Sequence, residues 1–226
     1  MRASKILAAL ERQILPGRSQ ARMQSLWEAR WSREDLDKPW MNRPISKQLV
    51  EAVDTGWFPR GGRVLDVGCG EGDVTQWLSE HSFPTLGIDF AESAIRRARN
   101  RHGEVAGERE FQVLDIVRQA PPDHRYAAVV DRGCFHAIKS NDSGRYVRNI
   151  ASVCPPEARL LLFISAFRGK TQLGQTEERA LLDHSIERAF AGHFEIIRSE
   201  EADLGRSCDL DGEPELPGLV YWMSRQ

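Results

Sequence analysis

The chain has 226 residues, of which 41% are hydrophobic, and carries a formal net charge of -2. This length suits one large domain with a substantial core, and the charge excludes the broad positive field that sequence-independent binding to nucleic acid requires. Apolar stretches all fall short of the roughly 20 residues that cross a bilayer, and Lys5 and Glu11 interrupt the opening segment where a signal peptide is apolar. We predict a cytoplasmic monomer or homodimer that acts on a small molecule, with neither nucleic acid nor a membrane as partner.

The first 58 residues are predicted to form a helical extension of two or three segments, one of them at Ile45–Val53. Aromatic rings on such an extension either pack against the main domain or line a lid over a ligand, and the sequence leaves both interpretations open. The main domain is predicted at residues 59–226. Four of the six tryptophans belong to the extension, namely Trp27, Trp31, Trp40 and Trp57.

From Val64 onward, short apolar runs alternate with longer amphipathic ones, a pattern typical of a parallel sheet covered by helices on both faces. Helices are predicted to begin near Gly72, Glu92 and Gly144. The predicted parallel strands are Arg63–Val67, Thr85–Asp89, Glu110–Leu114, Ala127–Val130 and Arg159–Ser165.

The last third of the chain changes character. A helix is predicted near Thr176–Phe190. The polar segment Arg168–Glu178 lies at the carboxyl end of the fifth predicted strand, where open α/β sheets bind ligands, and is predicted to form a loop over the acceptor side of such a site. Two late strands, His193–Arg198 and Gly218–Met223, flank an acidic loop at Leu210–Pro217, which indicates an antiparallel pair at one edge. The predicted fold is therefore α/β and doubly wound, with a mostly parallel, seven-stranded, Rossmann-like sheet.

A glycine-rich turn, Asp66–Gly72, follows the first predicted strand. Gly68 and Gly70 lack a β-carbon, so the backbone can turn sharply and approach a ligand, and the start of the next helix favours a carboxylate or phosphate. The spacing is G-x-G-x-G, with Asp73 where the dinucleotide fingerprint needs glycine or alanine. That carboxylate repels a pyrophosphate, whereas the helix start can accept a methionine carboxylate and Asp66 can bind its amino group. The turn favours S-adenosylmethionine.

The next two predicted strands also end in acidic residues. Asp89 follows the turn by about twenty residues, where a carboxylate can accept two hydrogen bonds from a ribose diol. Asp115 can accept from the adenine amino group, with Phe90 and Ile116 flanking the ring. A single aspartate is more often a helix cap or turn former, but three at successive strand ends indicate a common ligand.

These motifs resemble the class I S-adenosylmethionine-dependent methyltransferases over residues 64–226. A narrower resemblance begins at Asp131–Ile138, which is similar to the D-R-G-x-x-x-A-I segment of the thiopurine S-methyltransferase and thiol methyltransferase group. Arg145-Tyr146 and Leu182–Phe190 also look similar to that group, as does the W-x-x-x-W segment Trp27–Trp31 followed by Pro39-Trp40.

The resemblance implies roles for these residues. Trp27 and Trp31 would close over the cofactor, and Arg132 would stand at the mouth of the site. Trp40 would face the acceptor, and the predicted acceptor site comprises Trp40, Arg132, Phe135 and His136. The predicted cofactor site comprises Trp27, Trp31, Asp66, Gly68, Cys69, Gly70, Asp89, Phe90, Asp115, Ile116, Asp131 and Arg132.

Methyl transfer is an in-line displacement, so the protein chiefly positions the two reactants. A thiol acceptor needs only modest help from a cation such as Arg132, whereas an oxygen acceptor needs a base, for which His136 is the candidate. His136 can equally be a pocket-wall residue. Cys69 and Cys134 are predicted to be packing residues, because neither has an attached histidine or carboxylate motif.

The four cysteines are Cys69, Cys134, Cys154 and Cys208, without C-x-x-C spacing or a nearby histidine pair, which argues for reduced thiols and against a metal site. The leading hypothesis is S-methylation of a thiol or thiopurine-like heterocycle, with S-adenosylhomocysteine as the second product. Oxygen or nitrogen of a small aromatic acceptor is the alternative. A nucleotide-dependent oxidoreductase and a non-catalytic methyltransferase-like binding domain remain open as other classes.

Overall fold

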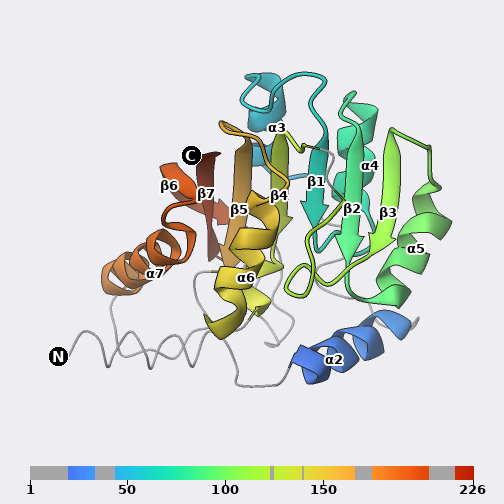
Figure 1. Ribbon diagram of the computed structural model, residues 1–226, viewed down its shortest axis with the longest axis horizontal. Helices are drawn as coiled ribbons and strands as arrows, with labels where there is room; N and C mark the ends of the chain where they lie inside the picture. Colours follow the sequence, from blue (N-terminus) through green and yellow to red (C-terminus); the bar gives the residue numbers. More distant parts are fainter. Residues whose placement is uncertain (1–19, 34–43, 123–124, 139, 166–174, 204–216) are drawn as a thin grey trace.

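The chain folds around a seven-stranded sheet of order β3-β2-β1-β4-β5-β7-β6 (Figure 1). The computed structural model describes residues 20–33, 44–122, 125–138, 140–165, 175–203 and 217–226. Neighbouring strands from β3 to β5 run parallel, whereas β7 runs antiparallel to both β5 and β6. This confirms the predicted sheet and its antiparallel edge pair. The strands are β1 (Val64–Val67), β2 (Thr85–Asp89), β3 (Arg109–Val113), β4 (Ala128–Arg132), β5 (Arg159–Ser165), β6 (Phe194–Asp203) and β7 (Pro217–Arg225).

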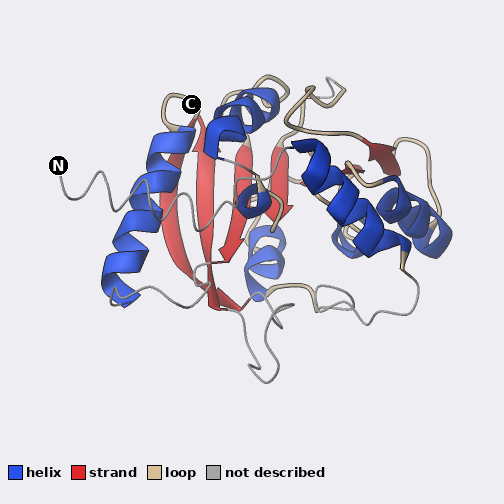
Figure 2. Cartoon of the chain, turned by 90° about the horizontal axis from the view of Figure 1, so that it is seen from below, coloured by secondary structure: helices blue, strands red, loops and turns tan. Residues whose placement is uncertain are grey.

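Helices cover both faces of this sheet (Figure 2). Successive residues of a strand point to opposite faces, so Val64 joins a core cluster with α3 and α4 while Leu65 joins one with α6 and α7. Helix α5 packs on the same face as α4, through Phe111 of β3. The helices on the two faces are α3 (Lys47–Asp54), α4 (Asp73–Glu80), α5 (Glu92–His102), α6 (Ser140–Ala151) and α7 (Gln175–Phe190).

The N-terminal extension divides into two parts with different positions. Helix α3 belongs to the main core, because Leu49 and Ala52 are fully buried against the sheet together with Phe58. The boundary predicted at residue 58 therefore falls after an integral helix. Helix α2 (Gln20–Ser32) instead lies across the end of the sheet toward which β1, β2 and β3 point (Figure 1). No helix within the described ranges is long and apolar enough to span a membrane.

Most predicted bounds differ from the observed ones by no more than one residue, and the larger differences include the ends of β4, β6 and β7 and the start of α6. β6 continues to Asp203, five residues beyond its predicted end at Arg198. β4 continues to Arg132, because Asp131 and Arg132 still pair with β5. α6 begins at Ser140, four positions before the predicted start at Gly144. There the helix continues through a glycine despite its low helix propensity, since the buried apolar face of α6 supplies the stability.

Candidate active site

The predicted acidic residues come together at the carboxyl ends of the parallel strands. The register pairs Val67 of β1 with Ile88 of β2 and with Asp131 of β4, so Asp66, Asp89 and Asp131 end neighbouring strands. β1 lies between β2 and β4, where the chain order of the strands reverses. Open α/β sheets bind ligands at this position. The structure therefore provides one shared site for these strand ends.

The glycine-rich turn after β1 is fixed by steric contacts. Gly68 and Gly72 have φ of +71° and +85°. A β-carbon on Gly68 would lie 2.6 Å from Cβ of Cys134, and one on Gly72 would lie 2.6 Å from the Phe111 ring. The N–H groups of Gly68 and Cys69 both donate to the carbonyl of Ile88, at 2.8 and 3.0 Å. These hydrogen bonds hold the turn against β2, and glycine is required at positions 68 and 72.

Asp66 joins β1 to α4. It is 2% exposed and accepts a hydrogen bond of 2.7 Å from the Thr75 hydroxyl. A β-carbon on Gly87 would lie 2.5 Å from that hydroxyl, so glycine on β2 leaves room for the contact. Burial, with a smaller contribution from the nearby carboxylate of Asp131, raises the pKa of Asp66 to about 7. The predicted contact of Asp66 with the amino group of the donor stays a prediction.

Replacing Asp66 by Asn is expected to stabilise the ligand-free protein at pH 8 and to have little effect at pH 4. The pKa of Asp66 is about 7 in the folded chain and near its usual 3.8 in the unfolded chain. The folded chain binds the extra proton between these pH values, so the free energy of unfolding falls as the pH rises through this window. Asn keeps the shape of the side chain and an oxygen that accepts from Thr75, but it carries no charge. At pH 8 the substitution should therefore raise the free energy of unfolding by about 2 to 4 kcal/mol. Thermal unfolding of both proteins from pH 4 to pH 8 measures this, and a difference that does not change with pH would contradict it.

Asp89 is the best-placed residue for a ribose diol. Its two oxygens accept hydrogen bonds from the Gly70 N–H at 3.2 Å and the Ala91 N–H at 2.8 Å. The side chain is half-buried, and each carboxylate oxygen retains a second lone pair that can accept from a ligand hydroxyl. Burial raises the pKa of Asp89 to about 6, so the carboxylate is ionised at neutral pH. These properties fit a diol that donates two hydrogen bonds.

Asp115 lies beside α2. It accepts hydrogen bonds of 2.9 Å from the Gln24 amide and 3.0 Å from the Val117 N–H. Phe90 packs in a small cluster with Trp31 and Trp27 of α2, whereas Ile116 is 4% exposed and belongs to the main core. The carboxylate and the aromatic cluster are compatible with an adenine ring at this position.

One face of α2 covers the site. Gln24, Glu28 and Trp31 are spaced four and three residues apart, which places them on the same side of a helix. Glu28 accepts from the Ser93 N–H at 3.2 and 3.3 Å. Trp31 is 4% exposed, and a β-carbon on Gly70 would lie 3.0 Å from its ring. Sequence reasoning found the tryptophans and missed Gln24 and Glu28, although their spacing relative to Trp31 was the available signal.

The structure corrects two predicted contacts. Asp131 is fully buried and accepts hydrogen bonds from the Gly133, Cys134 and Phe135 N–H groups and from the Tyr146 hydroxyl. Its carboxylate thus shapes the turn after β4 and is not directed at a cofactor. Phe135 is 8% exposed, and its ring centroid lies 5.0 Å from that of Tyr146, inside the core. We therefore reassign Phe135 from the acceptor pocket to core packing.

The remaining acceptor-side predictions are only partly within the described residues. Arg132 is half-buried and donates to the Pro44 carbonyl at 3.1 Å. The His136 ring faces Gly133, where a β-carbon would lie 3.2 Å from its Cε1. Trp40 and Cys208 lie outside the described residues. So does residue range 166–174, which includes most of the predicted acceptor loop, whereas residues 175–178 begin α7.

Cys134 packs against the main core and Cys69 against the cluster around Phe111, and the predicted contact of Cys69 with the cofactor stays a prediction. Burial raises the pKa of the Cys69 and Cys134 thiols well above their usual value, and the surrounding aspartates raise it further. A thiol that stays protonated at neutral pH is a poor nucleophile. Covalent catalysis by either cysteine is therefore disfavoured.

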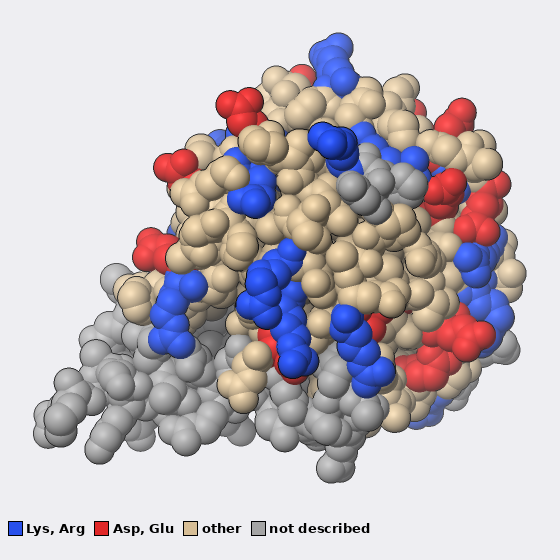
Figure 3. Space-filling model, viewed as in Figure 1, with Lys and Arg blue, Asp and Glu red and all other residues tan. Residues whose placement is uncertain are grey.

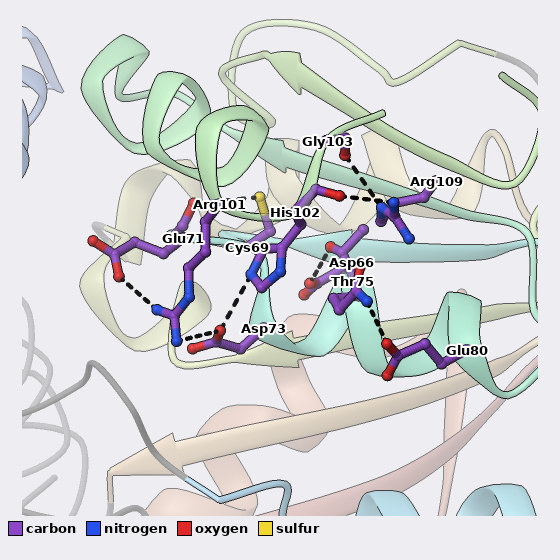
Figure 4. Close-up of polar contacts among 12 residues, drawn as sticks. Asp66, Cys69, Glu71, Asp73, Thr75, Glu80, Arg101, His102, Gly103 and Arg109 are labelled. Atoms are coloured by element: carbon purple, nitrogen blue, oxygen red, sulfur yellow. Dashed lines mark hydrogen bonds and ion pairs between the residues drawn. The ribbon is translucent and has the colours of Figure 1, made fainter. Parts of the chain in front are cut away.

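An ion-pair cluster connects the glycine turn to α5 (Figure 4). Glu71 is 7% exposed and pairs with Arg97 at 3.1 Å and with Arg101 at 3.2 Å. Asp73, the next acidic residue, pairs with Arg101 at 3.5 Å and contacts His102 at 3.3 Å. These ion pairs connect Arg97 and Arg101 of α5 to the turn that carries Gly70.

The site has the parts that S-adenosylmethionine requires. The N-cap of α4 is Gly72, which offers no side chain, so a ligand carboxylate can serve as the cap. Asp89 can accept from the ribose, and the Asp115 end can receive the adenine. This arrangement fits the class of S-adenosylmethionine-dependent methyltransferases that the sequence motifs resemble.

Comparisons with known proteins agree. Residues 64–157 match the family described as a methyltransferase domain. The ribosomal RNA small subunit methyltransferase C of Chromohalobacter salexigens is 35% identical over 130 residues, covering 54% of this chain and 37% of that protein. The thiopurine S-methyltransferase of Azotobacter vinelandii is 22% identical over 197 residues, covering 81% of this chain and 88% of that protein.

A solved structure shows the same fold. The N-methyltransferase NodS of Bradyrhizobium japonicum WM9, in complex with S-adenosyl-L-homocysteine, superposes with a TM-score of 0.63 at 14% identity, covering 90% of this chain and 98% of NodS. Residues 64–157 thus match a methyltransferase domain, and the chain has the fold of the methyltransferase NodS.

Proposed function

We propose that this chain transfers a methyl group from S-adenosylmethionine to the sulfur of a small molecule, either a thiol or a thiopurine-like heterocycle. The observation that carries the proposal is the covered donor site, in which Trp31 of α2 packs over Gly70 and the Gly70 N–H binds Asp89. The likeness to a thiopurine S-methyltransferase over 81% of the chain supports sulfur as the acceptor atom.

In this proposal, different residues bind the different parts of the donor. Asp89 accepts from the ribose, Asp115 accepts from the adenine amino group, and Trp27 and Trp31 cover the bound donor. Asp66 faces the amino group from beneath the turn, where Thr75 already orients it. The result is a donor held on its polar groups by carboxylates and helix termini, with the methyl group directed away from the turn.

The acceptor side needs little chemistry of its own. The bound donor supplies an electrophilic methyl carbon on a sulfonium, so the protein mainly has to hold a nucleophile in line with it. Arg132, at the mouth of the site, favours the ionised form of an acceptor thiol. His136 is the candidate base for an oxygen acceptor, which does not ionise unaided at neutral pH.

A nucleic-acid acceptor is the alternative suggested by the ribosomal RNA methyltransferase relative. The charge distribution favours a small molecule. Arg97 and Arg101 of α5 are paired with Glu71, and basic and acidic side chains are interspersed on the face that Figure 3 displays. Binding to RNA would instead call for a continuous basic surface. The alternative of a nucleotide-dependent oxidoreductase conflicts with Asp73 at the helix start that would receive a pyrophosphate.

The proposal is tested by transfer of a radiolabelled methyl group from S-adenosylmethionine to a mixed panel of thiols, phenols, amines and a structured RNA. We expect transfer to thiols. Arg132→Ala should slow it about tenfold by raising the acceptor pKa by about one unit, and His136→Ala should leave it unchanged. Transfer confined to phenols, amines or RNA would overturn the sulfur assignment, and donor binding without any transfer would support a non-catalytic domain.

A further inference from the structure

A side chain from within each of the helices α2 and α5 binds one end of the other helix. At the start of α5, the Glu28 carboxylate accepts from the backbone N–H and from the hydroxyl of Ser93. α5 begins at Glu92, so the Ser93 N–H is one of the donors that a helix leaves unpaired at its N-terminus, and a carboxylate also complements the helix dipole there. α2 thereby caps α5.

At the other end, α5 caps α2. Nη2 of Arg97 donates to the Arg33 carbonyl at 2.9 Å, one residue beyond the end of α2 at Ser32. A cation is favoured at a helix C-terminus, where carbonyls lack partners. The same guanidinium donates from Nη1 to Glu71 at 3.1 Å. One side chain of α5 therefore contacts both α2 and the residue that follows Gly70.

We propose that Arg97 is a positioning residue that couples closure of α2 to the conformation of the donor-binding turn. The inference rests on the proposed function and extends it to a residue outside the donor contacts. With its planar, two-sided guanidinium, Arg97 binds Glu71 only while Glu71 holds the turn in the conformation that presents Gly70 to Asp89. In that conformation Arg97 also fixes the end of α2 and so keeps Trp31 over Gly70. A donor that orders the turn thus strengthens the closed position of α2.

Arg97→Gln breaks this connection without leaving a buried charge alone. Glu71 keeps its ion pair with Arg101 at 3.2 Å, and Gln is a good helix former. Lys at position 97 carries a single ammonium in place of a fork, so it can serve Glu71 or the Arg33 carbonyl but not both. We expect Arg97→Lys to be intermediate between the original protein and Arg97→Gln.

Arg99→Gln is the matched control. Arg99 lies on the same helix and contacts the Phe111 carbonyl and Glu104. These contacts lie on the β3 side of α5 and involve neither α2 nor Glu71; Arg99 binds the backbone of Phe111, whereas only the Phe111 ring lies against Gly72. The control removes an arginine of α5 and leaves the proposed connection intact.

The experiment measures two quantities on each full-length protein. Calorimetric titration gives the affinity for S-adenosylhomocysteine, which should fall about tenfold in Arg97→Gln, equivalent to about 1.4 kcal/mol, and stay within twofold in Arg99→Gln. Hydrogen exchange gives the protection of residues 20–33, which S-adenosylhomocysteine should increase in the original protein and in Arg99→Gln but not in Arg97→Gln. Peptides from α6 serve as the internal reference for folding.

The outcomes separate this inference from the proposed function. If the original protein does not bind S-adenosylhomocysteine, the proposed function itself fails. If it binds, and Arg97→Gln shows the same affinity and the same ligand-induced protection of α2, the role of Arg97 is wrong while the proposed function stands. An equal loss in Arg97→Gln and Arg99→Gln would reduce Arg97 to a stabilising surface contact and would also overturn the inference.

Discussion

Gly68→Ala is expected to weaken binding of S-adenosylhomocysteine by about 30- to 1000-fold. The backbone at Gly68 has φ of +71°, and the added methyl group would lie 2.6 Å from Cβ of Cys134. The left-handed conformation costs about 1 kcal/mol for alanine and the overpacking a further 1 to 3 kcal/mol, so the turn has to move. Because Asp89 accepts from the N–H of Gly70 in this turn, displacement also misplaces the ribose acceptor. Calorimetric titration measures the affinity.

Gly61→Ala is the control for backbone strain alone. Gly61 has φ of +72°, nearly the value at Gly68, but nothing lies within 4 Å of a β-carbon placed on it. Both variants therefore share the conformational cost, and only Gly68→Ala collides with Cys134. Equal affinities for S-adenosylhomocysteine in the two variants would show that the contact with Cys134 does not set the turn.

Asp89→Ala is expected to lower the affinity for S-adenosylhomocysteine by about 100- to 1000-fold. Two hydrogen bonds to an ionised carboxylate are lost, each worth about 1.5 to 3 kcal/mol, and the Gly70 N–H loses its acceptor. The melting temperature should not fall by a comparable amount, because burial disfavours the charged form of Asp89 and the substitution removes that charge. Asp54→Ala, which removes an exposed carboxylate at the end of α3, should bind normally. Normal binding by Asp89→Ala would exclude Asp89 from the ribose site.

The same residue predicts a pH dependence of binding. The pKa of Asp89 is about 6 in the ligand-free protein. A ligand that donates to the carboxylate binds the ionised form, so protonation of Asp89 should lower the affinity by up to tenfold per pH unit below pH 6. Asp66, whose pKa is about 7, adds its own pH dependence at higher pH. Titrations between pH 5 and pH 8 follow both effects, and only the one with its midpoint near pH 6 should be absent in Asp89→Ala.

Much of the fold could be predicted because apolar runs and polar turns alternate clearly. The bounds of β2 and β5 match those predicted, since each is a continuous buried strand that ends in a polar residue. The end of β4 was placed too early because Asp131 is charged. Its burial depends on the Tyr146 hydroxyl from α6 and on the N–H groups of its own turn. Such a tertiary hydrogen-bond network leaves no local signal in the sequence.

The candidate site divides in the same way. The acidic strand ends follow from the geometry of a parallel sheet, so Asp66 and Asp89 could be predicted. The N-terminal tryptophans lie in two different environments. Trp31 packs over the glycine turn, whereas the Trp57 ring centroid lies 4.7 Å from that of Trp222, on the α3 face of the core. The role of Arg97 has no local signal in the sequence, because its partners, Glu71 and the Arg33 carbonyl, are distant in sequence.

The central claim is that the strand ends around Asp89 bind S-adenosylmethionine. Its most direct measurement is a calorimetric titration of the unmodified protein with S-adenosylhomocysteine, and separately with a reduced nicotinamide dinucleotide. We predict that one S-adenosylhomocysteine binds per chain and that the dinucleotide does not compete with it. Binding of the dinucleotide in its place would contradict the account.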